Sequence, residues 1–286
     1  MIKERFVPYL FLIPALVLIL VFKIYPIFDS LKESLFIPSF LAGEKIFAGF
    51  DNYLMLFEDP VFWNSVKVTL YLNVFINPLQ IILAFLLAIF LNRQMKGIGI
   101  FRAIHFIPIA VSMPIALIMW NVMLNPEQGI FNTILVALGF EPQPFLGSSD
   151  QAMWIIIMIA TWKGVGYWAI FLLAGLQEVP KNLYEAAAID GAGKWQQFIN
   201  ITFQMMKRPL AFVAVADTVA NFLLFAPMYI LTNGGPKNST NVLMNESYNS
   251  AFVYSDMGRA SAINIIILLI LLVVIAIEFK FLKAKH

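Results

Sequence analysis

The chain has 286 residues, of which 60% are hydrophobic and only 13% are charged. A soluble domain is nearer to half apolar and a quarter charged, so this composition excludes an ordinary soluble protein and indicates a polytopic protein of the lipid bilayer. The net charge of +2 does not suggest a nucleic-acid binder, and the lack of cysteine excludes disulfides, cysteine-ligated metals and thiol catalysis.

Six apolar segments are long enough to cross about 30 Å of hydrocarbon as helices. Apolar character that continues over more than about 18 residues favours helices, because a barrel strand alternates over about ten residues. Internal prolines are compatible with this interpretation, since neighbouring membrane helices satisfy the freed backbone groups. The sequence therefore predicts one all-α transmembrane domain over 1–286, with spans at about 7–26, 66–92, 103–125, 152–177, 208–231 and 260–282.

Lysine and arginine are unequally shared between the segments that connect these spans. The two termini and the loops after the second and fourth spans hold 12 of the 19 cationic residues: Lys3, Arg5, Arg93, Lys96, Arg102, Lys181, Lys194, Lys207, Arg208, Lys280, Lys283 and Lys285. The other three loops hold four, beside eleven acids. Because positive residues stay in the cytoplasm, we expect both termini to be cytoplasmic.

The predicted cytoplasmic loop at 178–204 contains a short helix with a smooth face. From Glu178 to Ile201 it reads EVPKNLYEAAAIDGAGKWQQFINI. Pro180 suits the first turn of a helix, and the residues that follow to 189 are good helix formers. Glycine at 191 permits a sharp exit. With Glu185 beside three alanines, this helix suits a groove on a soluble partner, although an interfacial helix that only connects two spans fits the same pattern.

The same residues carry a resemblance. Glu185, Ala186 and Ala187, followed by Asp190 and Gly191, resemble the EAA loop of ABC importer permeases. That family's pattern ends I-x-L-P, whereas Phe and Gln stand here at 203 and 204 after Ile201. Five other stretches are similar to the carbohydrate importer permeases of the maltose-F and glycerol-phosphate-A type: GFDNY at 49–53, DPVFW at 59–63, NPEQG at 125–129, LTNGGP at 231–236 and YNSAF at 248–252.

The resemblance implies a type I ABC importer permease fold. It implies the permease subunit of an ATP-driven, binding-protein-dependent carbohydrate importer that works by alternating access, and not an enzyme. The EAA loop would dock on a dimer of ATPase subunits, with Glu185 paired to a basic residue and Gly191 letting the loop flex. ATP and magnesium would bind that partner, because this sequence has no G-x-x-x-x-G-K-[ST] motif. A second, homologous permease and an extracytoplasmic sugar-binding protein are the other implied partners.

Polar residues inside spans are costly, so each is a candidate for function. Lys163 and Tyr167 stand four residues apart in the fourth span, as do Asp217 and Asn221 in the fifth, so each pair shares a helix face. In maltose-type permeases the spans on either side of the coupling loop line the sugar site. By that resemblance Gly164, Tyr167, Asp217 and Asn221 would line the path, with Lys163 beside them.

Alternatives remain at this point. Lys163 and Asp217 could form a purely structural ion pair, and Asn73, Asn77 and Gln80 in the second span could line the path or bridge helices. An importer of the same superfamily for glycerol phosphate, a polyamine or an amino acid is one alternative function. A secondary transporter that uses Asp217 and Lys163 as an ion relay is another, although that class usually has internal repeats, which this sequence lacks.

Overall fold

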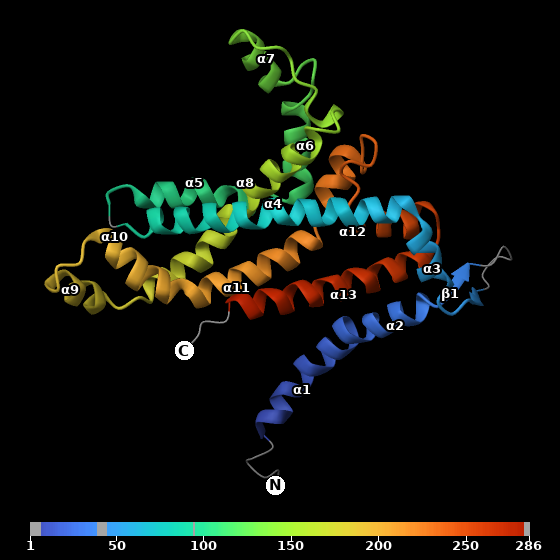
Figure 1. Cartoon of the computed structure of the whole chain (residues 1–286), viewed down its shortest axis with the longest axis horizontal. Helices are drawn as coiled ribbons and strands as arrows, with labels where there is room; N and C mark the ends of the chain where they lie inside the picture. The colour runs from blue at the N-terminus through green and yellow to red at the C-terminus, as the bar shows by residue number, and fades with distance from the viewer. Residues whose placement is uncertain (1–6, 39–44, 94, 283–286) are drawn as a thin grey trace. The chain divides into compact units, whose positions relative to one another are not determined.

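The computed structural model describes residues 7–38, 45–93 and 95–282, and most of them are helical (Figure 1). Four basic residues used to predict the orientation lie outside this range: Lys3, Arg5, Lys283 and Lys285. The chain divides into two compact units. The first comprises the residues up to Trp63 and Glu246–Leu269, and the second comprises Asn64–Asn245 and the residues from Ile270 onward.

The first unit contains a helical N-terminal segment, a strand pair and three of the motifs named above: GFDNY, DPVFW and YNSAF. Strands β1 and β2 are antiparallel, with Phe36 opposite Phe47. Its elements are α1 (Val7–Ile19), η2 (Leu20–Ile24), α2 (Tyr25–Glu33), β1 (Phe36–Pro38), β2 (Lys45–Phe47), α3 (Asp51–Glu58), η6 (Asn249–Val253) and the first part of α13 (Met257–Leu282).

The GFDNY and DPVFW motifs organise this unit through polar contacts. The buried Asn52 amide donates to the backbone carbonyls of Ser34 (2.8 Å) and Phe36 (2.9 Å), which fixes the start of the strand pair. Arg259 forms ion pairs with Asp59 (2.5 Å) and Glu246 (3.1 Å). These motifs therefore have a structural function in holding the helices and the strand pair of this unit together.

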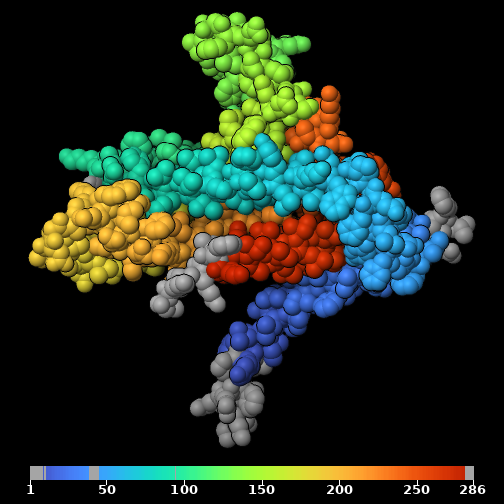
Figure 2. Space-filling view, viewed as in Figure 1, coloured from blue at the N-terminus to red at the C-terminus, as the bar shows by residue number. Residues whose placement is uncertain are grey.

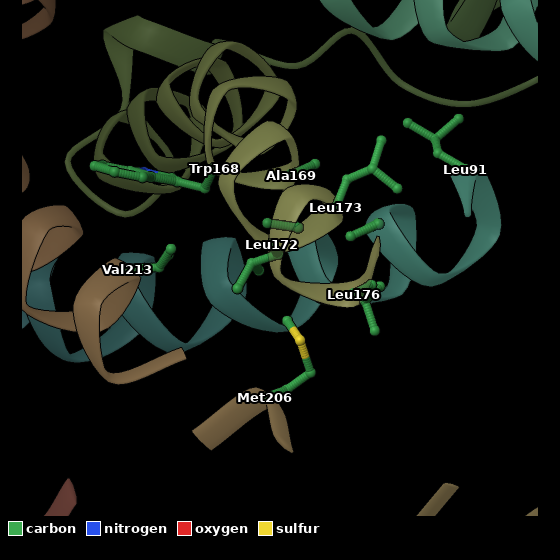
Figure 3. Packing of buried hydrophobic residues seen from close by; sticks show 10 residues of the cluster. Leu91, Trp168, Ala169, Leu172, Leu173, Leu176, Met206 and Val213 are labelled. Atoms are coloured by element: carbon green, nitrogen blue, oxygen red, sulfur yellow. The ribbon is translucent and has the colours of Figure 1, made fainter. Parts of the chain in front are cut away.

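The second unit is built around α8 (Ala152–Gln177). Leu91 of α4 and Met206 of α11 pack with Leu172 in the second half of α8 (Figure 3). The elements are α4 (Pro60–Leu91, apart from its first turn), α5 (Ile98–Ala110), α6 (Met113–Met123), α7 (Ile130–Ala137), η3 (Phe145–Gly147), α8, α9 (Lys181–Ile189), α10 (Lys194–Gln197), η4 (Phe198–Thr202), α11 (Phe203–Phe222), η5 (Met228–Thr232), the first half of α12 (Leu243–Tyr248) and the second half of α13.

A small residue allows α5 to approach α8 closely. A Cβ atom added to Gly166 would lie 2.3 Å from the backbone carbonyl oxygen of His105, a distance that no side chain tolerates. Small residues at helix contacts are typical of membrane proteins, where packing and hydrogen bonds, rather than the hydrophobic effect, bring helices together. This contact places the carboxyl half of α5 directly against the middle of α8.

Four of the six predicted spans correspond to single helices that are long and apolar enough to cross a membrane. Within the described residues these are Phe11–Glu33, Pro60–Leu91, Ala152–Gln177 and Met257–Lys280. The fourth predicted span, 152–177, has the same bounds as α8. The first and second predicted spans differ from their helices by several residues at one or both ends, since helix periodicity alone does not mark where a helix stops.

The other two predicted spans are not single helices of this kind. In place of a third span at 103–125, α5 and α6 meet at an angle of 99°, since Pro114 in the first turn of α6 supplies no N–H to the end of α5. In place of a fifth at 208–231, α11 ends at Phe222 and the next helical turn starts at Met228. Helix α11 also carries three ionic residues: Lys207, Arg208 and Asp217.

Candidate functional site

A network of buried polar side chains joins α4, α11 and the end of α13. The Asn221 amide nitrogen shares its two hydrogens among three oxygen atoms, those of Asn77 (2.8 Å), Asp217 (3.1 Å) and Gln80 (3.2 Å). Asp217 and Asn221 are 0% and 6% exposed. In such a dry environment each polar group needs a partner, so the network fixes the rotamers of these side chains.

Thr218 extends the network to an acid that the sequence analysis missed. The Asn77 amide donates to the Thr218 hydroxyl (3.0 Å), which donates to a Glu278 carboxylate oxygen (2.7 Å). Glu278 is close to the carboxyl end of α13, where an acidic residue is usually solvated. No signal in the sequence paired it with Thr218, which lies 60 positions earlier.

Lys163 does not pair with Asp217. Its ammonium group donates to the backbone carbonyls of Val111 (2.6 Å) and Pro108 (2.9 Å), at the bend between α5 and α6. The last carbonyls of a helix have no intrahelical partner, and a cation there also meets the negative end of the helix dipole. Lys163 therefore stabilises the broken end of α5, and the structural ion pair considered above is replaced by this contact.

The five path residues expected from the sequence surround one cavity of about 340 Å³. Gly164 leaves room there for Gln80, whose amide nitrogen would lie only 2.8 Å from a Cβ atom at 164. The complete lining is Gln80, Ile109, Met113, Ala160, Lys163, Gly164, Tyr167, Trp168, Asp217, Ala220, Asn221 and Leu224. Asn73 and Asn77 are not part of this lining, and Asn73 instead donates to the Thr69 carbonyl of its own helix (2.8 Å).

Aromatic rings form one wall of this cavity. The Tyr167 ring contacts the Trp168 ring edge to face, with centroids 4.8 Å apart, and the Phe171 ring at 5.2 Å. Tyr167 remains 44% exposed, so a large part of its ring is free to contact a bound molecule. The cavity thus combines an aromatic face with amide and carboxylate groups. Trp168 was not among the sequence candidates, although its position beside Tyr167 was a usable signal.

The predicted coupling helix is present as α9 (Lys181–Ile189), with Pro180 as its N-cap residue. Gly191 has a φ of +78°, so the sharp exit uses a left-handed conformation that glycine adopts without strain. Glu185, Ala186 and Asp190 are exposed, and Ala187 is half-buried. The surface of this helix, yellow in Figure 2, also presents Ile189, which is 86% exposed.

The segment after α9 runs into α11 without a break. Helices α10, η4 and α11 follow one another from Lys194 to Phe222 with no residue between them. Because Gln204 stands where the family pattern has proline, the helix retains the N–H group that proline would remove. The part of this loop that starts at Lys194 and the polar side chains of α11 consequently belong to one continuous helical segment.

Comparison with known proteins identifies the family. Residues 78–282 match the family described as "Binding-protein-dependent transport system inner membrane component". The chain belongs to this family. It is accordingly a transport subunit rather than an enzyme, in a system whose ATPase is a separate subunit, which confirms the prediction from the EAA loop.

Three relatives are similar over nearly the whole permease. The probable ABC transporter permease YurN of Bacillus subtilis is 38% identical, with 98% of this chain and 97% of the relative covered. The trehalose/maltose permease MalF of Thermococcus litoralis is 36% identical (92% and 89% covered). The sn-glycerol-3-phosphate permease UgpA of Agrobacterium fabrum is 32% identical (99% and 96% covered).

A solved structure supports the fold of the permease. A chain of a bacterial alginate ABC transporter, crystallised in complex with an alginate pentasaccharide-bound periplasmic protein, superposes with a TM-score of 0.82. The two sequences are 23% identical, and the match covers 100% of this chain and 98% of the other. The permease therefore has the type I ABC importer permease fold that the sequence resemblance implied.

Proposed function

We propose that this permease carries a carbohydrate, a sugar or an oligosaccharide, through the cavity lined by Tyr167, Gln80 and Asn221. The observation that supports it best is the lining itself. Sugar hydroxyls need both donors and acceptors, for which the lining offers the Tyr167 hydroxyl, the Gln80 amide N–H groups and the Asp217 Oδ2 atom, which has no hydrogen-bond partner among the described residues. The C–H faces of a sugar need an aromatic surface, which the half-exposed ring of Tyr167 offers. The names of the trehalose/maltose relative and of the alginate transporter agree with this substrate class.

Transport would proceed by alternating access driven by a dimer of ATPase subunits that bind ATP and magnesium. The exposed face of α9 would insert into a cleft of the ATPase, with Glu185 and Asp190 meeting basic groups and Gly191 acting as the flexible exit. A second, homologous permease would complete the path, since one chain offers one coupling helix. An extracytoplasmic binding protein would deliver the sugar, by analogy with the alginate transporter and its pentasaccharide-bound periplasmic protein.

The membrane arrangement proposed with this function has six crossings and cytoplasmic termini, in the inner membrane of a bacterium or archaeon. Helix α11 would provide the fifth crossing despite its polar residues, because Asp217, Thr218 and Asn221 are all buried inside the protein. The bent pair α5 and α6 would provide the third. The excess of Lys and Arg in alternate loops supports this orientation.

Glycerol phosphate is the second candidate substrate, because the relative UgpA is named as an sn-glycerol-3-phosphate permease. A phosphate group is usually bound by arginine or by a free lysine. Lys163 is the cation that lines this cavity, and its ammonium group already donates to two backbone carbonyls. The chemistry of the lining therefore favours a neutral, hydroxyl-rich substrate. Because the chain belongs to the binding-protein-dependent family, the alternative of an ion-driven secondary transporter is not supported.

Substrate uptake by cells that hold the complete importer tests this proposal. Labelled maltose, trehalose, an oligosaccharide series and glycerol 3-phosphate are compared, with uptake normalised to the amount of membrane-inserted permease. We expect uptake of at least one sugar, reduced by Tyr167→Ala and largely kept by Tyr167→Phe. Uptake of glycerol phosphate but of no sugar would overturn the carbohydrate assignment.

A further inference from the structure

A second cavity, larger than the one described above, lies beside the coupling helix. Its volume is about 660 Å³, and it opens among the ends of three apolar helices: α4, which ends at Leu91, α5, which begins at Ile98, and α8, which ends at Gln177. Its lining is Asn92, Arg93, Met95, Lys96, Ile98, Arg102, Leu176, Gln177, Val179, Lys181 and Tyr184. We call this cavity the basic pocket.

The residues that line the basic pocket carry positive charges and no negative charge. Four of its lining residues are cationic: Arg93, Lys96, Arg102 and Lys181. None of its lining residues is acidic, and among the described residues no ion pair engages any of these four side chains. Four cations held around one cavity repel each other, and a bound anion would relieve that repulsion.

Arg102 gives the pocket a fixed wall. One guanidinium nitrogen donates to the carbonyl of Leu91 (2.8 Å), the last residue of α4, which holds the side chain in place. The Nε atom of Arg102 is buried and has no hydrogen-bond partner among the described residues. A buried N–H group without an acceptor is unfavourable, so an acceptor oxygen that reaches this atom would stabilise it.

We propose that the basic pocket binds the phosphate-bearing headgroup of an anionic phospholipid. The ends of three membrane helices meet at the depth where lipid headgroups lie, and basic pockets between such helices bind acidic headgroups. Met95, Ile98, Leu176 and Val179 supply apolar walls for the glycerol and the first acyl carbons, which a free phosphate ion does not need. The orientation proposed above decides only the leaflet, the cytoplasmic one. The inference does not depend on which solute is transported.

This site touches the coupling helix directly. Lys181 and Tyr184 of α9 line the pocket, and the Tyr184 hydroxyl is hydrogen-bonded to Thr202 of η4 (2.8 Å). A headgroup in the pocket would therefore contact both the membrane helices and the element that faces the ATPase. The lipid would hold the first turn of α9 against the membrane end of α8.

Lipid binding to the purified full chain tests the proposal. Native mass spectrometry in detergent compares dioleoylphosphatidylglycerol, dioleoylphosphatidylcholine and inorganic phosphate as ligands. The test variant carries Arg93→Gln and Lys96→Gln, two exposed side chains of the pocket. The matched control carries Lys207→Gln and Arg208→Gln, which removes the same pair of residue types from an exposed position of α11 outside the pocket.

We expect the wild-type chain to bind phosphatidylglycerol more tightly than phosphatidylcholine. Each cation near a membrane surface strengthens binding of an acidic lipid about 5-fold, so the test variant should bind phosphatidylglycerol about 25-fold more weakly. The control should change by about 2-fold or less. A charge-preserving variant, Arg93→Lys with Lys96→Arg, should retain binding. That result would show that the weaker binding of the test variant comes from lost charge and not from misfolding.

Three results would overturn the proposal. Equal weakening in the test and control variants would mean general attraction to the basic surface. Inorganic phosphate that displaces phosphatidylglycerol at equal concentration would assign the pocket to a soluble anion. Unchanged lipid binding in the test variant, together with loss of copurification with the ATPase subunit, would assign the pocket to an acidic group of that partner.

Discussion

Lys163 of α8 donates a 2.6 Å hydrogen bond to the backbone carbonyl of Val111, and this contact explains two features at once. It accounts for a lysine inside a span that otherwise lacks charge, and it stabilises the 99° bend between α5 and α6. A bend in a membrane helix exposes carbonyl groups that have no water to pair with, so a cation from a neighbouring helix is an effective partner.

Replacing Lys163 with methionine should destabilise the permease. Methionine keeps an unbranched side chain, one atom shorter than lysine, but leaves the Pro108 and Val111 carbonyls without their donor, at an expected cost of about 1.5–3 kcal/mol. Thermal unfolding of the detergent-solubilised chain measures this loss, and Lys163→Arg should retain most of the stability. Because Lys163 and Asp217 line the same cavity, Lys163→Met and Asp217→Asn should show a small coupling energy when combined, whereas an ion pair between the two residues would make their losses strongly non-additive.

Tyr167→Ala should lower sugar uptake without lowering the amount of permease in the membrane. The half-exposed ring faces the cavity, and losing one stacking face or hydrogen bond should weaken binding by about 0.5–1.5 kcal/mol, or about 2- to 13-fold. Tyr167→Phe should be milder, because it removes only the hydroxyl. Uptake per inserted permease that is the same in Tyr167→Ala as in the wild type would argue against this position for the substrate.

Asn221→Ala should behave differently from Tyr167→Ala. Asn221 is 6% exposed and donates to Asn77, Gln80 and Asp217, so its removal leaves buried acceptors unpaired. We expect a lower thermal stability, by about 1–3 kcal/mol, as well as lower uptake. The matched comparison is Asn73→Ala, a buried amide that bonds within α4 and does not line the cavity. Equal uptake in these two alanine variants would contradict a transport role for Asn221.

Glu185→Lys should separate the ATPase from the permease while leaving the fold intact. The side chain is exposed on α9, so no buried contact is lost within this chain. Reversing its charge would repel a basic group on the ATPase, which should reduce both copurification and uptake. Glu178→Lys is the matched control, because Glu178 is exposed in the same loop but lies outside the EAA sequence. A normal ATPase complex in Glu185→Lys would refute the coupling role.

Acid should weaken the first unit through Asp59. Partial burial raises the pKa of the Asp59 carboxyl, but hydrogen bonds from Arg259 and from the Val61 N–H outweigh it and hold the pKa below its ordinary value. A carboxyl whose pKa is lower in the folded state contributes stability above about pH 4, and this contribution is lost as the pH falls through the folded value. Thermal unfolding between pH 7 and pH 3 should show this loss in wild type and a smaller one in Asp59→Asn. Asp51→Asn, which changes an exposed acid of α3, should keep the wild-type slope.

The sequence was most informative where local patterns decide the structure. Helix α9 could be predicted at 181–189 because proline begins it and Gly191 ends it, and α8 because Lys163 is the one charged residue in its long apolar run. Gly164, Tyr167, Asp217 and Asn221 could be grouped from helical spacing and family resemblance, and the cavity does bring them together. Whether they contact substrate remains a prediction.

Long-range relationships could not be predicted in the same way. The partner of Lys163 is a backbone carbonyl 52 positions away, and every residue carries such a group, so no side-chain pattern marks it. The bend at Val111 and the early end of α11 depend on how backbone groups are satisfied by neighbouring helices. Glu278 joined the polar network for a similar reason, since its bond to Thr218 exists only once α13 packs on α11.

The unbroken helical run from Lys194 to Phe222 has a mechanical consequence. At about 1.5 Å per residue such a rod is about 40 Å long, with the coupling loop at one end and the Asp217–Asn221 turn near the other. A tilt of about 5° at the loop would swing the far end through about 3.5 Å, comparable to a hydrogen-bond length. A small displacement at the Lys194 end of the rod would therefore be enough to break or restore the bonds that Asn221 makes across the cavity, with no relay of side chains between the two ends.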